Sequence, residues 1–363
     1  MASITHKTHR LTPPDYWLTV VTIILSIFGL IMVYDSSVAI ALRDFSDQYH
    51  FVREQIRWFF VGSIALIIGS FFDYHRLYKL AVPLLLVTLF LLLLVFIPSI
   101  GIAALGAHRW INFGFFVFQP AELAKLSLII YLAAWFSYPE KGRILPFLFL
   151  LGLVIGLVVA EPDLGTAFII LMIALTMYFF SGASLWQFAL LIPALATSVG
   201  ALAVFSPYRL RRITTFFNSD IDPLGASYQI RQVLLALGSG GLWGLGLGKS
   251  RQKYEYLPEA NTDSIFAIIG EEIGFIGAAA VIFLFLFLVW RGFRIARRAP
   301  DTFGKLLALG ISSWIGLQAL VNLGAMVALI PLTGVPLPLI SYGGSSLILM
   351  LFGIGILLNI SRQ

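Results

Sequence analysis

The sequence has 363 residues, of which 59% are hydrophobic and 12% are charged, whereas soluble chains are about a quarter charged. This composition excludes an ordinary water-soluble domain, because too few charged groups remain to cover its surface. The lack of cysteine excludes disulfides and thiolate metal sites, and the five histidines show no zinc-ligand spacing. The net charge of +6 leaves nucleic-acid binding as an alternative until the basic residues are placed.

Apolar segments of membrane-spanning length recur along the whole chain. A bilayer core needs about 20 apolar residues per helix, and continuous runs such as 84–96 lack the alternation of a barrel strand. The sequence therefore predicts an all-α polytopic membrane protein of about ten transmembrane helices, forming a single domain over residues 1–363. The predicted spans are 16–36, 55–72, 77–97, 118–137, 144–160, 163–180, 184–205, 263–290, 304–330 and 339–360.

Lysine and arginine are unequally distributed between the two sides that these crossings define. Both chain ends share the richer side, which carries Lys7, Arg10, Arg294 and Arg297 among others. The positive-inside rule therefore predicts that both termini are cytoplasmic. Because the basic residues follow this topology, no continuous basic stripe is left to bind nucleic acid.

The opposite side carries one large extracytoplasmic loop, residues 206–262, between the seventh and eighth predicted helices. A loop of this length is too long to be a simple connector. Apolar residues including Ile230, Val233 and Leu237 recur at helical spacing, which predicts a short helix along the membrane interface. The glycine-rich stretch 238–250 superficially resembles a phosphate-binding loop, but its spacing departs from that motif.

Several ionisable residues lie within or beside the spans, where each costs at least about 2.5 kcal/mol and is a functional candidate. Glu122 and Lys125 share one helix face, which fits either a local ion pair or a lysine that faces a cavity and binds an anion. Glu161 and Asp163 flank a proline where a helix begins. Asp163 is either a simple N-cap or, together with Glu161, part of a functional cavity.

Asp263 lies where the large loop enters a strongly apolar helix. Thr262 or Asp263 is a candidate N-cap, but a carboxylate at such a mouth, flanked by Glu259 and backed by apolar surface, also suits a general base. Glu271 and Glu272 lie deeper in the same helix. For these two, polar contacts inside the bundle are favoured over catalysis.

Proline and glycine are densest over residues 331–346. Proline excludes a regular helix there, and irregular backbone at membrane depth survives only where it is buried in protein or lines a wet cavity. We expect this segment to form a re-entrant wall of an outward-facing cavity. Ser341 and Ser345 would then offer polar groups to a ligand.

Four motifs, in this order, are similar to those of the SEDS family, whose members act in shape, elongation, division and sporulation. The motifs are residues 119–125 (QPAELAK), 161–166 (EPDLGT), 257–263 (LPEANTD) and 336–346 (PLPLISYGGSS). The resemblance covers essentially the whole chain and implies a bacterial peptidoglycan glycosyltransferase that polymerises lipid II at the outer face of the cytoplasmic membrane. Residues 322–325 and 342–346 look more like the division branch, FtsW, than the elongation branch, RodA.

The resemblance also implies roles for single residues. Asp263 falls on the family's essential aspartate, which we expect to be the general base of an inverting transfer. Asn261 and Ser264 depart from the family's usual histidine and phenylalanine. With the candidates found from the residues themselves, the expected substrate-binding set is Trp110, Arg109, Glu122, Lys125, Glu161, Asp163, Arg212, Glu259, Ser341 and Ser345.

In this transfer the departing diphosphate gains negative charge, which a nearby cation would stabilise. Lys125, arginines of the large loop such as Arg212, or a divalent ion such as Mg or Mn would serve, and the sequence does not choose among them. The resemblance implies a class B penicillin-binding protein as partner, together with other divisome proteins for the division branch. The alternative function is a lipid II flippase, but the clustering of polar sites near one face favours the glycosyltransferase.

Overall fold

The computed structural model describes residues 13–98, 100–104, 107–114, 116–138, 143–193, 214, 226–254 and 256–363. These residues are mostly helical, as the composition predicts. The helices are α1 Tyr16–Phe45, α2 His50–Phe71, α3 His75–Leu94, α4 Pro120–Phe136, α5 Ile144–Ala160, α6 Leu164–Phe180, α9 Ala226–Ser239, α10 Ile265–Arg298, α11 Thr302–Met326 and α12 Gly344–Ser361.

Each predicted span except 184–205 overlaps one of these helices. Residues 185–193 of that exception are helical, and the rest of the span lies outside the described residues. Five of the described helices, α1, α3, α10, α11 and α12, are long and apolar enough to cross a membrane, and α5 and α6 are shorter apolar helices. The protein is therefore a multi-pass membrane protein. The largest boundary errors are at α1 and α10, which continue to Phe45 and Arg298 because hydropathy marks only the apolar part of a helix.

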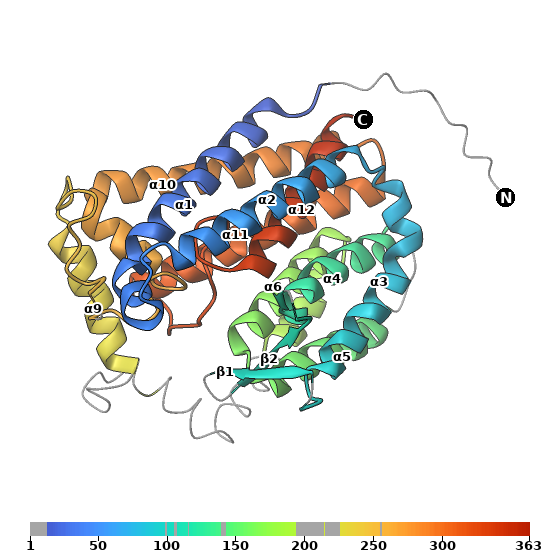
Figure 1. The fold of residues 1–363 in the computed structure, drawn as a ribbon. Coiled ribbons are helices and arrows are strands. Elements are labelled where there is room, and N and C mark those ends of the chain that lie inside the picture. Colours follow the sequence, from blue (N-terminus) through green and yellow to red (C-terminus); the bar gives the residue numbers. More distant parts are fainter. Residues whose placement is uncertain are drawn as a thin grey trace.

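The helices form two groups in space (Figure 1). One group contains α1, α2, α10 and α12, and the other contains α3, α4, α5 and α6. Helix α11 contacts α10 and α12 on one side and α4 and α6 on the other, so it joins the two groups. It is also the most deeply buried of the candidate membrane spans. Its side chains are therefore well placed to connect distant parts of the chain.

Several helix ends meet at one end of the bundle, which we call the terminal end. The backbone N–H of Asp15, the N-cap of α1, donates to the Ser361 hydroxyl at the end of α12 over 3.1 Å. The Asp15 carboxylate pairs with Arg291, near the end of α10. The opposite end, where α10 begins after Ser264, is called the site end.

The stretch expected to be a loop between the third and fourth spans contains a small antiparallel sheet. Its strands are β1 Gly101–Ala104, β2 Ala107–Asn112 and β3 Val117–Phe118, in the order β1-β2-β3. The expectation of a purely helical protein is wrong in this detail. Strand β2 buries Ile111 and exposes Asn112, but an alternation this short does not stand out from the neighbouring apolar spans.

The part of the large loop that the structure describes contains α9, which packs against α10 (Figure 1). Val233 and Ala236 are buried on its inner face, whereas Leu234 and Leu235 are exposed. The placement of this helix along a membrane interface stays a prediction.

Helix α10 is kinked at Gly274, whose φ is 67°. The glycine-rich stretch after α9 crosses α10 at this kink. The backbone N–H groups of Leu245 and Gly246 donate to the carbonyls of Glu271 and Glu272, over 3.0 Å and 2.9 Å. The loop therefore satisfies carbonyl groups that the kink removes from the helical ladder.

We expect the substitution Gly274→Ala to lower the thermal stability of the protein. A positive φ costs an L-residue about 1–2 kcal/mol, and a Cβ at this position would lie 2.3 Å from the Gly244 nitrogen. Unfolding followed by tryptophan fluorescence in detergent measures the change in Tm. Gly152→Ala is the matched control, because a Cβ at Gly152 of α5 meets nothing within 4 Å. Equal Tm values for the two variants would contradict the expectation.

Candidate functional site

The proline-rich segment 331–343 is irregular, as predicted, and lies against helices of both groups. A Cβ on Gly165 of α6 would lie 2.4 Å from the Thr333 carbonyl oxygen, and a Cβ on Gly29 of α1 would lie 2.5 Å from that of Leu339. Glycine at both positions allows the helices to approach the backbone of the segment. The segment is therefore held closely between α1 and α6.

Two side-chain amides of α11 hold this segment. The Gln318 amide donates to the Pro336 carbonyl over 3.0 Å. The Asn322 amide, one helical turn further along, donates to the Val335 carbonyl over 2.8 Å and to the Asp263 carbonyl over 2.7 Å. Asn322 thus joins the proline-rich segment directly to the start of α10.

Asp263 lies at the mouth of α10 with 9% of its surface exposed. The N-cap of α10 is Ser264, so the N-cap predicted at Thr262 or Asp263 is one or two residues early. The Ser264 hydroxyl donates to the Asp263 carboxylate over 3.4 Å and accepts a hydrogen bond from Gln229 of α9 over 3.1 Å. The helix of the large loop therefore reaches the aspartate through Ser264.

Ser341 and Glu259 shape the chain around Asp263. The Ser341 hydroxyl donates to the Thr262 carbonyl over 2.5 Å and accepts from the Leu337 N–H over 2.9 Å. Glu259, which is exposed and has a φ of 53°, accepts a hydrogen bond from the Thr262 hydroxyl over 2.7 Å. Both side chains fix the turn that precedes the aspartate.

Lys125 and Glu122 form the local ion pair that their spacing predicts, with 2.6 Å between Nζ and Oε1. The Lys125 ammonium also donates to Gln318 over 2.9 Å and lies 5.4 Å from the centre of the Trp314 ring. Its side chain is only 1% exposed. Through Gln318, one turn from Asn322 on α11, the ion pair is linked to the segment that adjoins Asp263.

Asp163 is the N-cap of α6, as predicted, and accepts from the Thr166 N–H over 3.1 Å. Its other carboxylate oxygen accepts from the Gln119 amide over 3.0 Å. The Gln119 backbone N–H donates to the Ser345 hydroxyl over 3.1 Å. Gln119 therefore brings Asp163 and Ser345, which are far apart in the sequence, to one place at the site end.

Arg109 of β2 holds the turn between α5 and α6. Its guanidinium donates to the carbonyls of Glu161, over 3.3 Å, and Pro162. The Glu161 side chain is 0% exposed, and neither carboxylate oxygen has a hydrogen-bond partner among the described residues. Burial, reinforced by the charge of Asp163, raises the pKa of Glu161 to about 8, against a smaller opposing effect of Arg109.

The remaining predicted residues are less connected to this network. Trp110 is half-buried on β2, opposite Ile102 of β1. Arg212 lies outside the described residues. As for a metal, the described part of the chain contains no group of three or more histidine, cysteine, aspartate or glutamate residues that would hold one.

Glu271 and Glu272 are buried in polar contacts, as favoured, but their partners Ser250 and Lys253 lie in the large loop and not on another helix. The Glu272 carboxylate accepts from the Ser250 N–H over 3.0 Å and pairs with Lys253 over 3.1 Å, while Glu271 accepts from the Ser250 hydroxyl. Lys253 pairs in turn with Asp35 of α1 over 2.8 Å. The glycine-rich stretch therefore wraps around carboxylates of its own chain.

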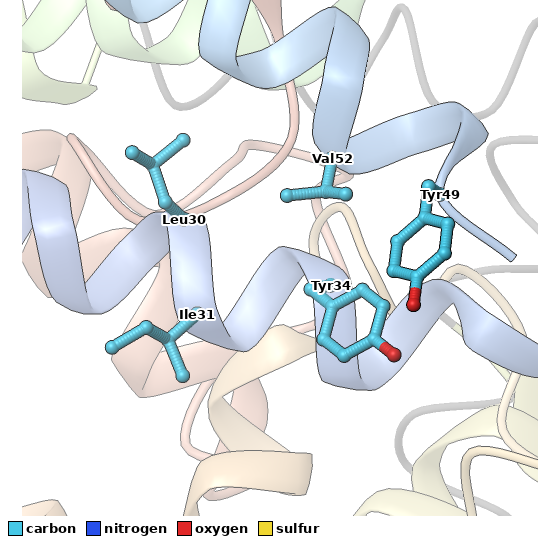
Figure 2. A pocket seen from close by; sticks show the side chains of 5 residues that line it. All are labelled: Leu30, Ile31, Tyr34, Tyr49 and Val52. Atoms are coloured by element: carbon cyan, nitrogen blue, oxygen red, sulfur yellow. The ribbon is translucent and has the colours of Figure 1, made fainter.

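An apolar groove lies on the wall formed by α1 and the start of α2 (Figure 2). It has a volume of about 340 Å³ and is lined by Leu30, Ile31, Tyr34, Tyr49 and Val52. The rings of Tyr34 and Tyr49 stack 5.6 Å apart. Next to these residues along the chain, Gly29 packs against Leu339 and Phe51 packs against Tyr342. One wall thus carries the groove and also contacts the proline-rich segment.

Sequence reasoning followed charged groups and missed three neutral amides, Gln119, Gln318 and Asn322. The signal was present, because an amide within or beside an apolar span is costly unless it is hydrogen-bonded. The spacing of Gln318 and Asn322 also places them on one face of their helix.

Comparisons with known proteins agree with this architecture. Residues 16–363 match the family described as Cell cycle protein, that of FtsW, RodA and SpoVE. Stage V sporulation protein E of Bacillus subtilis (strain 168) is 43% identical over 98% of this chain and 99% of its own. A protein named Probable peptidoglycan glycosyltransferase FtsW, from Geobacter sp. (strain M18), is 43% identical over 96% of this chain and 97% of its own.

Two solved structures share the fold. A chain from a peptidoglycan synthase complex, described for its coordination of polymerisation and crosslinking, matches with a TM-score of 0.78 and 29% identity over 96% of this chain and 98% of its own. The rod shape determining protein RodA of Thermus thermophilus matches with a TM-score of 0.71 and 29% identity over 96% of this chain and 97% of its own.

The buried Glu161 carboxyl predicts a pH dependence of stability. Its folded pKa of about 8 lies above its ordinary value of 4.5, so between these values the folded state keeps a proton that the unfolded state loses. The free energy of unfolding should therefore fall as the pH rises from about 4.5 to about 8. Glu161→Gln should remove this slope. The measurement is Tm in detergent at pH 5 to 9, with Asp44→Asn, an exposed carboxylate of α1, as control. A slope that persists in Glu161→Gln would contradict the prediction.

Proposed function

The chain belongs to the cell cycle protein family of FtsW, RodA and SpoVE, and we propose that it polymerises lipid II by an inverting transfer with Asp263 as the general base. It is a peptidoglycan glycosyltransferase, the activity named for relatives that are 43% and 42% identical over nearly the whole chain. The observation that carries the assignment of the base is the position of Asp263. This almost buried carboxylate lies at the mouth of α10, where the proline-rich segment, α9 and α11 converge.

The proposed reaction is a single displacement at the anomeric carbon. Asp263 takes the proton from the 4-hydroxyl of the acceptor's N-acetylglucosamine as that oxygen attacks the anomeric carbon of the donor's N-acetylmuramic acid. The bond from that carbon to undecaprenyl pyrophosphate breaks, and the configuration inverts because no covalent enzyme intermediate forms. One carboxylate is sufficient for this role, because the leaving diphosphate needs no proton from a general acid.

The backbone around Asp263 supports a fixed position for the base. The Asp263 carbonyl is held by Asn322 of α11, and the preceding Thr262 carbonyl is held by Ser341. Contacts from two different parts of the fold therefore restrain consecutive residues. A general base must lie within hydrogen-bond reach of the proton that it removes, so such restraint favours catalysis.

The charge of the leaving diphosphate requires a cation. Lys125 is buried against Glu122 and Gln318, so we assign it a positioning role and give the contact with the diphosphate to arginines of the large loop, including Arg212. With no three-residue donor cluster in the described part of the chain, an Mg or Mn ion would need substrate phosphates as further ligands.

We place the site end at the outer face of the bacterial cytoplasmic membrane, with both termini in the cytoplasm. The arginines near the end of α10, which lie at the terminal end, support this orientation. We further propose a class B penicillin-binding protein as the partner that crosslinks the new strand. The structural relative found in a peptidoglycan synthase complex supports this pairing. A flippase is not favoured, since the relatives are named as glycosyltransferases.

Asp263→Asn should abolish glycan polymerisation, because an amide cannot accept the proton of the attacking hydroxyl. The assay supplies purified protein with lipid II in detergent, with and without the partner transpeptidase, and follows glycan strands by gel. Asp44→Asn, which changes an exposed carboxylate at the end of α1, should keep full activity. Both variants should insert into the membrane and elute as the wild type does. Polymerisation by Asp263→Asn would overturn the assignment.

We propose that the groove on α1 and α2 accommodates the polyprenyl tail of the substrate. It is apolar and shares its wall with the proline-rich segment, so a tail lying there would keep the sugar near the site end. Val52→Trp, which fills the groove, should raise the KM for undecaprenyl lipid II at least several-fold and leave kcat nearly unchanged.

Val61→Trp is the control for this experiment, because Val61 lies on an exposed face of α2 and does not line the groove. For a substrate analogue with a short prenyl chain, the wild type and Val52→Trp should have equal KM values. The same loss with short and long tails would contradict a role of the groove in tail binding.

A further inference from the structure

We propose that the terminal end of the protein carries a specific binding site for an anionic phospholipid, in a groove between α6, α10 and α11. The groove has a volume of about 430 Å³, within the range of roughly 300–1,000 Å³ that is usual for small-molecule sites. It is lined by Phe180, Trp290, Phe293, Arg294, Arg297 and Leu309. The site lies at the other end of α10 from Asp263 and is independent of the catalytic proposal.

The floor of the groove is apolar and fixed by close packing. A Cβ on Gly292 of α10 would lie 2.1 Å from the Ser312 hydroxyl of α11, so the two helices are in close contact at this level. Phe180, the last residue of α6, packs against Phe293 with 6.4 Å between the ring centres. The end of α6 and the α10–α11 pair therefore form the apolar part of the groove.

The charge of the groove is positive. Arg294 and Arg297 are three residues apart on α10, so both side chains lie on one face. The neighbouring Arg291 pairs with Asp15, but neither Arg294 nor Arg297 forms an ion pair with any residue that the structure describes. Two guanidinium groups above an apolar notch match the charge and the bidentate geometry of a phosphodiester.

The order of groups along α10 matches a lipid better than a soluble anion. Trp290 is 51% exposed and lies beside the apolar part of the groove, and tryptophan is enriched at the interface between acyl chains and headgroups. Arg297 is seven residues further along, about 10 Å nearer the terminal end at 1.5 Å per residue. A lipid would place its acyl chain along Phe180 and Phe293 and its phosphate at the arginines. Basic pockets between transmembrane helices bind anionic headgroups in this way.

Quenching of Trp290 by brominated lipids tests the site. The purified full-length protein is reconstituted in phosphatidylcholine bilayers that contain a minor fraction of phosphatidylglycerol, with bromine on the acyl chains of one lipid or the other. At equal mole fraction, brominated phosphatidylglycerol should quench more than brominated phosphatidylcholine. The excess should vanish in Trp290→Phe, which identifies the reporting tryptophan.

The same excess should be lost in the double variant Arg294→Gln, Arg297→Gln and kept in Arg298→Gln, which removes an adjacent charge that does not line the groove. Arg294→Lys with Arg297→Lys should retain a part of it, and this variant guards against misfolding of the glutamine pair. Equal quenching by the two lipids, or an excess that the glutamine pair does not reduce, would overturn the proposal. Loss of the excess on adding inorganic phosphate would also overturn it and assign the groove to a soluble anion.

Discussion

The structure depends on satisfying one stretch of irregular backbone inside a membrane protein. Segment 331–343 has no helical ladder to pair its carbonyls and amides, and an unpaired buried polar group costs about 1–3 kcal/mol. Side chains supply the missing partners. Gln318 and Asn322 pair with consecutive carbonyls, and Gln55 of α2 pairs with the Ser341 carbonyl and the Gly343 N–H. Each of these contacts also fixes a helix, so the segment sets the arrangement of the bundle at the site end.

The candidate site follows from the same requirement. Asn322 uses one amide group for two carbonyls, that of Val335 in the irregular segment and that of Asp263 at the mouth of α10. Gln318 also joins two parts of the site, because its side-chain oxygen accepts a hydrogen bond from Lys125 while its NH2 group donates to the Pro336 carbonyl. A change in α11 would therefore displace both the segment and the aspartate without touching substrate. The geometry of the site rests on neutral amides, whereas the chemistry that we propose for it rests on a carboxylate.

The parts of this arrangement that the sequence predicted are those that depend on residues close together in the chain. Hydropathy located the helices, and local rules identified the cap at Asp163 and the ion pair of Glu122 with Lys125. Gln119 with Ser345, Asn322 with Asp263, and Lys253 with Asp35 are pairs that no spacing rule relates. Such pairs are set by helix packing, which one sequence does not specify. The strands at 101–118 are too short to show a pattern.

The charged groups inside the bundle differ in their surroundings from those at the two ends of α10. The two buried lysines of the described residues are paired: Lys125 with Glu122, and Lys253 with both Asp35 and Glu272. Removing one member of such a pair leaves a buried charge, which is costlier than exchanging both, so these groups are fixed by stability and are poorly available for a ligand. At the two ends of α10, Asp263 precedes the helix at the site end, and Arg294 and Arg297 line the groove at the terminal end. The groups that we propose to meet the sugar and the lipid phosphate therefore lie at opposite ends of one long helix.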